Sequence, residues 1–276
     1  MNRLHVVRES GLYLALCLVS ALMLLPFAWV AFGAFKTQGE FMSNPGGWLP
    51  ESFANLDNFI VLFTEEGFGP YLVNSIIVSA VTVLANVLFC SMAGYALAKL
   101  PFRGRGLLMG CVLVAMTVPY VALFVPQFLI TVQLGLVNTL AGIVAPMLVM
   151  PLGVFIMRQF ALSIPDELLE AARIDGAGEF GIFLRVFLPL LGPAIATVSI
   201  FTFLASWNSF LWPLVVAQTE EVFTLPVGLA TASQASNTTA YGLLLAGAIV
   251  VLLPVLILFL FLQRYFIQGI AATGLK

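Results

Sequence analysis

The sequence predicts an all-α integral membrane protein that crosses the bilayer six times. Of its 276 residues, 61% are hydrophobic and only 9% are charged. Soluble domains carry roughly 25% charged residues because a folded surface has to face water. The few charged residues are gathered between long charge-free stretches, and the basic ones favour one side of the membrane. Composition, spacing and charge asymmetry therefore indicate the same fold class.

The charge-free stretches give the positions of the spans. A helix needs about 20 apolar residues to cross the hydrocarbon core, and a charge at its centre costs roughly 2.5–3.5 kcal/mol. The stretch 106–157 is long enough for two crossings, with a break at the segment 133–138. We predict transmembrane helices over residues 11–35, 71–98, 107–131, 138–157, 188–217 and 241–262.

The first and last spans each allow more than one interpretation. Residues 11–35 follow a short polar segment, 1–10, as a signal peptide would. Their apolar stretch is too long for such a peptide and five further spans follow, so we interpret it as a retained helix. Residues 222–263 are free of charge but contain the polar run 231–239, so only the second half is expected to span.

Prolines in or near the spans predict kinks, because proline removes a helical hydrogen bond. Freed backbone groups are tolerated in a membrane where protein or a cavity satisfies them. The prolines concerned are Pro26, Pro119, Pro126, Pro146, Pro151, Pro193, Pro213 and Pro254.

Lysine and arginine give the orientation. Basic residues concentrate on the cytoplasmic side of membrane proteins. With the N-terminus inside, only Lys36 lies outside, and both termini are predicted to be cytoplasmic. The inside residues are Arg3, Arg8, Lys99, Arg103, Arg105, Arg158, Arg173, Arg185, Arg264 and Lys276.

The predicted spans contain no Asp, Glu, Lys, Arg or His. Proton-driven carriers commonly use intramembrane carboxylates or histidines, and membrane enzymes need an activated nucleophile or a metal. We therefore expect no catalytic residue, no metal site and no cofactor on this chain, and an energy source outside the spans. The net charge of −2 argues against a nucleic-acid partner. A secondary carrier or a channel subunit for a small polar solute remains the alternative.

Four polar or amphipathic residues in the spans are candidates for a substrate path. Amides in a membrane either bond neighbouring helices or line a polar pathway. Aromatic faces beside an amide suit a polyhydroxylated ligand, although tryptophans also occur at the membrane interface. The candidates are Gln127, Trp207, Asn208 and Trp212.

The loop between the fourth and fifth spans, residues 158–189, is predicted to hold two short helices. Ser163 is a candidate N-cap for the first, and Pro165 suits its first turn. Gly176 is a natural stop. The second helix is expected from about residue 178 to 187. A helical hairpin lying on the membrane surface and a docking element for a partner fit this pattern equally well.

The same loop resembles a known motif. Glu170-Ala171-Ala172 is followed after three residues by Gly176 and, after nine more, by Val186, with Leu188-Pro189 one residue on. This is similar to the EAA loop of binding-protein-dependent ABC importer permeases of the MetI-like family, with Val186 in place of the usual Ile. The resemblance implies the type I importer permease fold, with this loop as the coupling helix that contacts a cytoplasmic ATPase. On this basis the coupling residues are Glu170, Ala171, Ala172, Asp175, Gly176 and Phe183.

The resemblance covers roughly residues 11–276. Five segments are similar to the carbohydrate branch of the family, the maltose permease type: 119–127, 135–139, 207–213, 224–228 and 263–269. It implies import of a sugar or sugar-like solute in a bacterial or archaeal cell (inner) membrane. The implied partners are membrane lipid, a homologous second permease, two ATPase subunits that bind ATP and Mg²⁺, and an extracytoplasmic solute-binding protein.

The predicted organisation follows from these assignments. The outer loops 36–70 and 218–240 are candidates to receive the binding protein. The resemblance implies that the loop 218–240 enters the binding protein. Residues 71–264 form a five-helix core that includes the loop 158–189. The remaining parts are the cytoplasmic N-terminus 1–10, the first helix 11–35, the extracytoplasmic loop 36–70 and the cytoplasmic tail 265–276.

Overall fold

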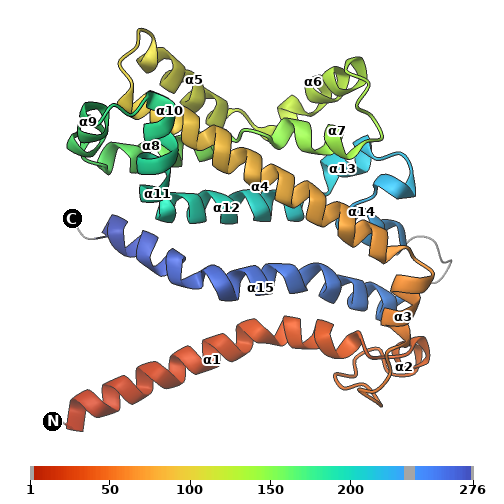
Figure 1. Ribbon diagram of the computed structural model, residues 1–276. Helices are drawn as coiled ribbons and strands as arrows, with labels where there is room; N and C mark the ends of the chain where they lie inside the picture. The colour runs from red at the N-terminus through yellow and green to blue at the C-terminus, as the bar shows by residue number, and fades with distance from the viewer. Residues whose placement is uncertain (1–2, 233–239, 275–276) are drawn as a thin grey trace. The chain divides into compact units, whose positions relative to one another are not determined.

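The computed structural model describes the backbone of residues 3–232 and 240–274, and the side chains of residues 11–232 and 240–261. Regular secondary structure in the described ranges is entirely helical (Figure 1). The chain divides into two compact units, which are residues 1–68 with 228–254 and residues 69–227 with 255–276. The prediction of an all-α fold is confirmed.

The first unit contains α1 (Arg3–Gly33), α2 (Gln38–Ser43), α3 (Asp57–Thr64) and the beginning of α15 (Tyr241–Gly274). Thr37 and Glu40 form a capping box at the start of α2. The side-chain amide of Asn58 donates to the carbonyl oxygens of Ala34 (2.8 Å) and Lys36 (2.9 Å). The segment predicted as the outer loop 36–70 is therefore partly helical and is hydrogen-bonded to the end of α1.

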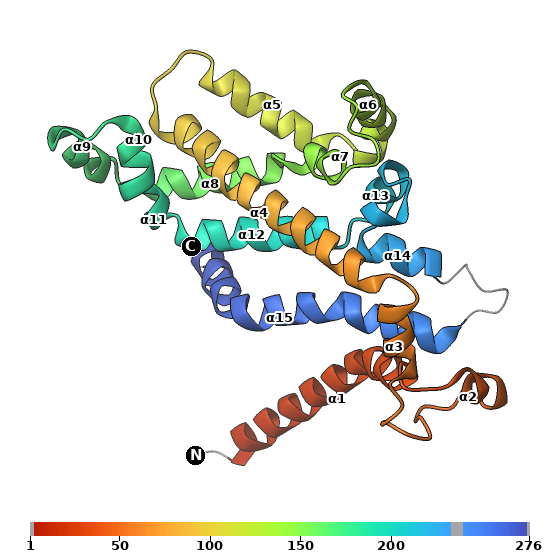
Figure 2. The same cartoon turned by 45° about the vertical axis from the view of Figure 1, so that its right-hand side comes forward.

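The second unit contains the remaining helices, which are shown from a second direction in Figure 2. They are α4 (Phe68–Lys99), α5 (Arg105–Thr117), α6 (Tyr120–Gln133), α7 (Leu140–Val144), η1 (Ala145–Met147), α8 (Pro151–Ser163), α9 (Asp166–Ile174), α10 (Glu179–Ile182), the π-helical turn η2 (Phe183–Phe187), α11 (Leu188–Leu190), α12 (Gly192–Trp207), α13 (Leu211–Val216) and η3 (Glu220–Val222); α14 (Leu225–Ala232) crosses the unit boundary.

Three helices are long and apolar enough to cross a membrane, over Gly11–Gly33, Phe68–Lys99 and Tyr241–Phe261. Three pairs of helices pass the same test together but are bent, so the described residues hold up to six spans. The bends are 105° between α5 and α6, 45° between Leu140–Met147 and α8, and 80° between Glu179–Leu190 and α12. Six spans agree with the sequence, but the third, fourth and fifth are broken.

A proline lies at each of the three bends. Pro119, Pro151 and Pro193 each lie at or next to the first residue of the helix that follows a bend. Proline is tolerated there because the first amides of a helix have no helical partner. Pro26 and Pro254 lie inside continuous helices, so proline alone does not decide where a span breaks.

Two predicted boundaries differ from the structure. The fifth span, predicted over 188–217, is interrupted at residues 208–210 between α12 and α13. The predicted tail 265–276 continues α15 as helix up to Gly274. Residues 233–239 of the predicted outer loop, and 275–276, lie outside the described residues.

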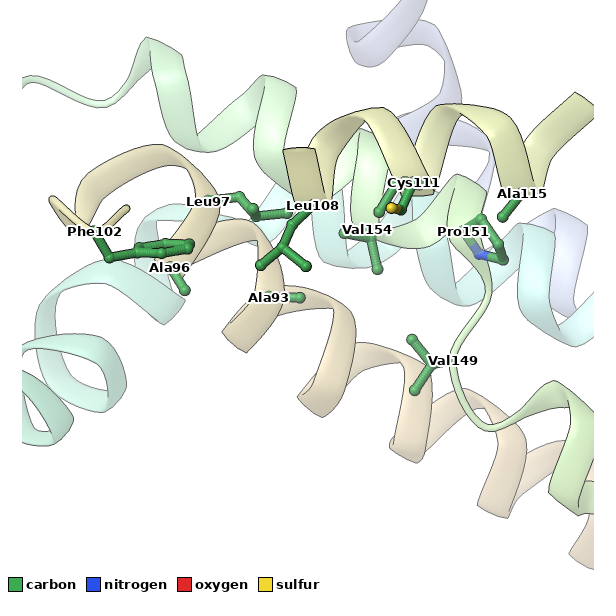
Figure 3. A pocket seen from close by; sticks show the side chains of 11 residues that line it. Ala93, Ala96, Leu97, Phe102, Leu108, Cys111, Ala115, Val149, Pro151 and Val154 are labelled. Atoms are coloured by element: carbon green, nitrogen blue, oxygen red, sulfur yellow. The ribbon is translucent and has the colours of Figure 1, made fainter. Parts of the chain in front are cut away.

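An apolar groove of about 430 Å³ lies in the second unit between α4, α5 and the start of α8 (Figure 3). All of its lining side chains are apolar, so it offers no hydrogen-bonding group to a sugar. Its lining is formed by Ala93, Ala96, Leu97, Phe102, Leu108, Cys111, Val112, Ala115, Val149, Pro151 and Val154.

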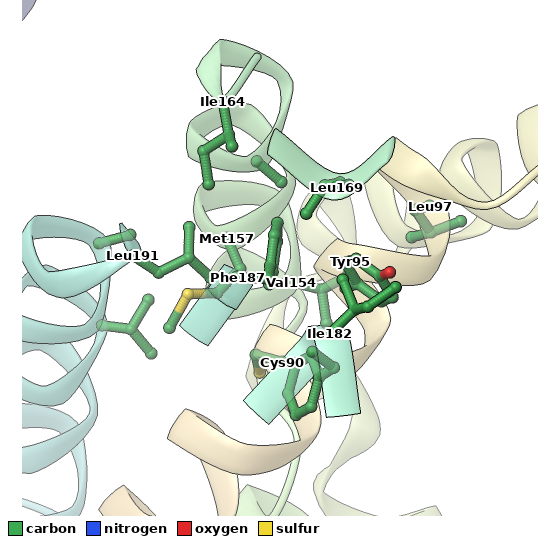
Figure 4. Close-up of a cluster of buried hydrophobic side chains, with 14 of the residues drawn as sticks. Cys90, Tyr95, Leu97, Val154, Met157, Ile164, Leu169, Ile182, Phe187 and Leu191 are labelled. Carbon is green, nitrogen blue, oxygen red and sulfur yellow. The ribbon is translucent and has the colours of Figure 1, made fainter. Parts of the chain in front are cut away.

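A large core of the second unit lies where α4, α8 and the loop 158–189 meet (Figure 4), and it shares Leu97 and Val154 with the lining of the groove. Met157 of α8 and Phe187 of η2 are completely buried there, and Leu169 of α9 is 1% exposed. Fully burying such a side chain contributes about 1.5–3 kcal/mol. The loop is thus packed against α4 and α8.

Candidate functional site

The candidate site is the loop 158–189, and its first helix is α9. α9 begins at Asp166, directly after Pro165. Asp166 and Glu167 lie in its first turn and Arg173 in its last, which matches the helix dipole. The prediction that Ser163 caps this helix is wrong, because its hydroxyl donates to the carbonyl of Phe160 at 2.7 Å, at the end of α8.

Gly176 ends α9, as predicted. Its φ is +83°, in the left-handed region that favours glycine. The amide of Gly176 donates to the carbonyl of Arg173, and the amide of Ala177 donates to that of Ala172, each at 3.0 Å. These two bonds form a Schellman motif, which satisfies the last carbonyls of the helix. The chain therefore turns sharply from α9 towards α10.

α9 has a buried side and an exposed side. Leu169 is buried in the core, and Ala172 is half-buried against it. Glu170, Ala171 and Asp175 are exposed. Among the apolar residues of this loop, Ile174 is 86% exposed and Phe180 of α10 is 67% exposed. An exposed surface of mixed charge and large apolar side chains is typical of a protein contact.

Phe183 is placed differently from the other five predicted coupling residues. Its side chain is 3% exposed and lies in the core described above. Its ring lies 5.7 Å from that of Tyr95, between centroids. The chain itself therefore covers Phe183, which holds the loop against α4 and offers no surface to another subunit in this structure. The coupling role predicted for Phe183 therefore stays a prediction, and its buried ring can act only through the position of the loop.

A hydrogen-bond network that the sequence analysis did not predict joins the loop to α4. The Tyr95 hydroxyl donates to Glu179 Oε2 at 2.6 Å, and Arg173 Nε donates to Glu179 Oε1 at 2.7 Å. The Tyr95 ring also packs on Phe187, with 4.6 Å between centroids. Glu179 thus connects the end of α9, the start of α10 and the last turns of α4.

Lys99, at the end of α4, forms the second connection. Its Nζ donates to the carbonyl of Ile164 and to Asp166 Oδ1, both at 2.6 Å. The Lys99 ammonium lowers the pKa of the Asp166 carboxyl, first through this hydrogen bond and then through its charge. Because the folded pKa is depressed, the contribution of this pair to stability is present above the ordinary Asp pKa and is lost only as the pH falls through the lowered one. The pair is therefore intact at neutral pH. A pattern of Tyr and Lys four residues apart at the end of a span is the signal that could have found both connections.

The predicted substrate-path residues are not all available to a ligand. Trp207 is 2% exposed and Trp212 is 1% exposed, and Trp212 Nε1 donates to the carbonyl of Gly142 at 3.1 Å. Neither indole face is therefore open to a sugar within this chain. Asn208 is exposed, and its amide donates to the carbonyl of Leu204 at 2.9 Å, which leaves its oxygen free to accept.

Gln127 of α6 is half-buried, and its Oε1 has no hydrogen-bond partner among the described residues. Leaving such an acceptor unpaired costs about 1–3 kcal/mol, so a partner from outside this chain is expected to satisfy it. Trp212 of α13 packs edge-on against Phe124 of α6, with ring centroids 5.6 Å apart. The structure therefore brings α6 and α13 together, whereas no described contact joins Gln127 to Asn208.

We expect replacement of Gly176 by Ala to destabilise the loop by about 1–2 kcal/mol, the cost of a left-handed conformation for a residue with a side chain. A Cβ at Gly176 meets no atom within 4 Å, so the effect comes from the backbone alone. Gly178→Ala is the matched control, since Gly178 is equally free of neighbours and has a φ of −71°. Thermal unfolding in detergent measures both, and equal midpoints would contradict this explanation.

Long apolar helices, three of them continuous and three formed by bent pairs, are features of an integral membrane protein. The chain belongs to the family described as "Binding-protein-dependent transport system inner membrane component", whose model matches residues 90–272. It is an integral membrane protein and a permease of the ABC type, not an enzyme.

Relatives of known name are similar over nearly their whole length. The arabinooligosaccharides transport system permease AraQ of Halalkalibacterium halodurans is 42% identical, with 94% of this chain and 97% of the relative covered. AraQ of Bacillus subtilis is 37% identical, covering 98% and 96%. The trehalose/maltose permease MalG of Thermococcus litoralis is 29% identical, covering 99% of each.

A solved structure has the same fold. It is a bacterial ABC transporter involved in the import of the acidic polysaccharide alginate, and one of its chains matches with a TM-score of 0.83. The match covers 96% of this chain and 99% of that one, at 22% identity. The type I permease fold expected from the sequence is thereby confirmed.

Proposed function

We propose that this chain translocates a sugar, delivered by an extracytoplasmic binding protein, and that it is driven by separate ATPase subunits that dock on α9. The observation that carries the proposal is the exposed side of α9, which bears Glu170, Ala171 and Asp175. The opposite side of α9 is packed against the core formed with α4 and α8. The spans themselves supply no ionisable group to drive a cycle.

The proposed assembly contains a homologous second permease, which would enclose the path together with this chain, and two ATPase subunits. ATP and Mg²⁺ would bind on the ATPases, and closure of their dimer would move α9. The contact has to differ in free energy between the inward- and outward-facing states, because a contact equal in both states shifts neither. We further propose that both termini of this chain are cytoplasmic, as the distribution of its basic residues supports.

Arabino-oligosaccharides are the substrate class that we propose first. The support is that two relatives, 42% and 37% identical over almost the full chain, are permeases of arabinooligosaccharide transport systems. Among the described residues, the exposed amide of Asn208 and the unpaired oxygen of Gln127 are the polar groups that we assign to the sugar path. Trp207 and Trp212 are left out of this assignment because both are buried.

Affinity purification in mild detergent tests the assembly. We expect an ATPase subunit and a second permease to be retained, and the reconstituted complex to take up arabinotriose in an ATP- and binding-protein-dependent manner. Uptake driven by an ion gradient without any associated ATPase would instead favour the secondary carrier, and uptake down a gradient without ATP would favour a channel. Retention with uptake of another sugar would keep the coupling and change only the substrate class.

Replacing Asn208 by Leu is expected to raise the KM for uptake by about tenfold, because a site that bonds a substrate hydroxyl loses roughly 1–3 kcal/mol when the partner is removed. Competition between sugars in proteoliposomes measures the change in selection. Gln127→Leu provides a second test of the same path. Unchanged uptake and selection in the Asn208 variant would leave its amide with only the structural bond to Leu204.

A further inference from the structure

α4 carries the hydrogen bonds that hold two functional segments of the second unit, one at each end. It is 32 residues long and unbroken, with its only proline, Pro70, in the first turn. The third, fourth and fifth spans are all bent by 45° or more. At about 1.5 Å per residue, the 20 residues from Ser75 to Tyr95 cover roughly 30 Å, the thickness of a hydrocarbon core.

At its C-terminal end, α4 holds the loop 158–189 at two points. Lys99 bonds Ile164 and Asp166, where α9 begins. Tyr95 bonds Glu179, where α10 begins, and Glu179 in turn pairs with Arg173 at the end of α9. Both ends of α9 are thus connected to α4 by charged or strongly polar groups, and bonds of this kind are about twice as strong as neutral ones.

At its N-terminal end, α4 holds the segment 221–225. The side-chain amide of Asn74 donates to the carbonyl oxygens of Glu221 (2.8 Å) and Phe223 (2.9 Å). The amide of Leu225 donates to Ser75 Oγ at 2.8 Å. Asn74 and Ser75 are 8% and 3% exposed, so these bonds are shielded from water and costly to break. Figures 1 and 2 both show α9 and α10 near one end of α4 and α13 near the other.

A close contact with α8 also fixes α4 at its C-terminal end. A Cβ at Gly94 would lie 2.9 Å from the backbone nitrogen of Arg158 and 2.7 Å from the Cβ of Met157. The two helices therefore touch through their backbones just before the coupling loop begins. Packed cores move as bodies and not by continuous bending, so a displacement of α9 is carried to α4 without being absorbed at the junction.

We infer that α4 transmits the movement of the ATPase-facing loop to the segment 221–225, with Tyr95, Lys99, Asn74 and Ser75 as positioning residues that connect the two. The inference rests on the proposed function, in which α9 contacts the ATPase and the outer loop 218–240 receives the binding protein. Nucleotide bound outside this chain at one end of α4 then changes the surroundings of the segment at the other end.

The test reads the outer segment while nucleotide is added to the ATPases. A cysteine at Gln218, which is exposed and adjacent to the segment, is labelled with a membrane-impermeant maleimide in the reconstituted full complex, after Cys17 and Cys111 are replaced by Ser. The measured quantity is the ratio of labelling rates with and without Mg²⁺ and a non-hydrolysable ATP analogue.

We expect Tyr95→Phe, which removes one hydroxyl, and Asn74→Leu each to shrink this nucleotide-dependent ratio at least about threefold. The double variant should lose no more than the larger single loss, because both changes interrupt one connection. Tyr13→Phe is the matched control and should retain the full ratio, since Tyr13 is 67% exposed on α1. Ser75→Ala provides a milder change at the same end should Asn74→Leu fail to retain the ATPases.

The outcomes separate the inference from the function on which it rests. A wild-type complex whose labelling ignores nucleotide, or that retains no ATPase, would overturn the proposed coupling itself. A wild-type response that survives unchanged in Tyr95→Phe and Asn74→Leu would overturn only the role of α4. Losses that multiply in the double variant would do the same, because they would mean that two independent connections were broken.

Discussion

Replacing Glu170 by Lys is expected to lower ATP-dependent uptake more than tenfold while the chain stays folded in the membrane. Glu170 is exposed, and it has no hydrogen bond or ion pair among the described residues. A surface substitution of this kind usually changes the free energy of unfolding by no more than about 0.5 kcal/mol. At a protein contact, the same charge reversal places like charges together or removes a paired one, which costs several kcal/mol.

Two measurements on the same preparation distinguish these effects. ATPase retained on the purified variant reports the contact, and thermal unfolding in detergent reports the fold. Glu65→Lys is the matched control, since Glu65 is an exposed carboxylate at the end of α3, outside the coupling loop. It should retain the ATPase. Normal uptake by Glu170→Lys, with its ATPase in place, would count directly against a docking role for α9.

Replacing Asn86 by Leu is expected to have the largest effect on stability, about 2–4 kcal/mol. Asn86 is completely buried on α4. Its amide donates to the carbonyl of Met147 at 2.6 Å, and its oxygen accepts from the amide of Met150 at 2.8 Å. These two backbone groups lie at the break in the fourth span, and leucine of similar size would leave both unpaired. An unpaired group costs about 1–3 kcal/mol, and no water at the centre of a bilayer replaces the partner.

The control for this prediction lies on the same helix. Ser79 is 1% exposed, and its hydroxyl has no hydrogen-bond partner among the described side chains. Ser79→Ala should therefore leave the midpoint of thermal unfolding unchanged or raise it slightly. If Asn86→Leu unfolded at the wild-type temperature, the break at 147–150 would have to be stabilised by contacts other than this amide.

The pattern of bends shows why the sequence predicted spans better than their shapes. Hydropathy depends on the number of consecutive apolar residues, and the six predicted spans agree in number with the three continuous and three bent candidates. A bend depends on which backbone groups lose their partners and on what satisfies them. Pro119 and Pro151 coincide with breaks, whereas Pro26 lies in a continuous helix. The amide of Asn86 that satisfies the break before Pro151 lies some 60 residues earlier in the chain.

In the candidate site, too, the local features could be predicted from the sequence and the burial of side chains could not. Gly176 could be predicted as a helix stop, because a left-handed residue after a helix is a local requirement. Ser163 failed as a cap because its hydroxyl had an equally local alternative at the end of α8. Trp207 and Trp212 were predicted to line a substrate path, yet the chain buries both. Burial is decided by neighbours distant in sequence, and no residue type or spacing encodes it.

The sequence by itself determined the all-α membrane fold and predicted six spans and the two short helices of the loop 158–189, because each depends on local composition or on a motif of fixed spacing. Only the tertiary structure decided how that loop is held. The bonds from Tyr95 to Glu179 and from Lys99 to Asp166 join residues separated by 84 and 67 positions. Such pairs form because packing of α4 against α8 brings them within bonding distance, and that distance is a property of the folded chain.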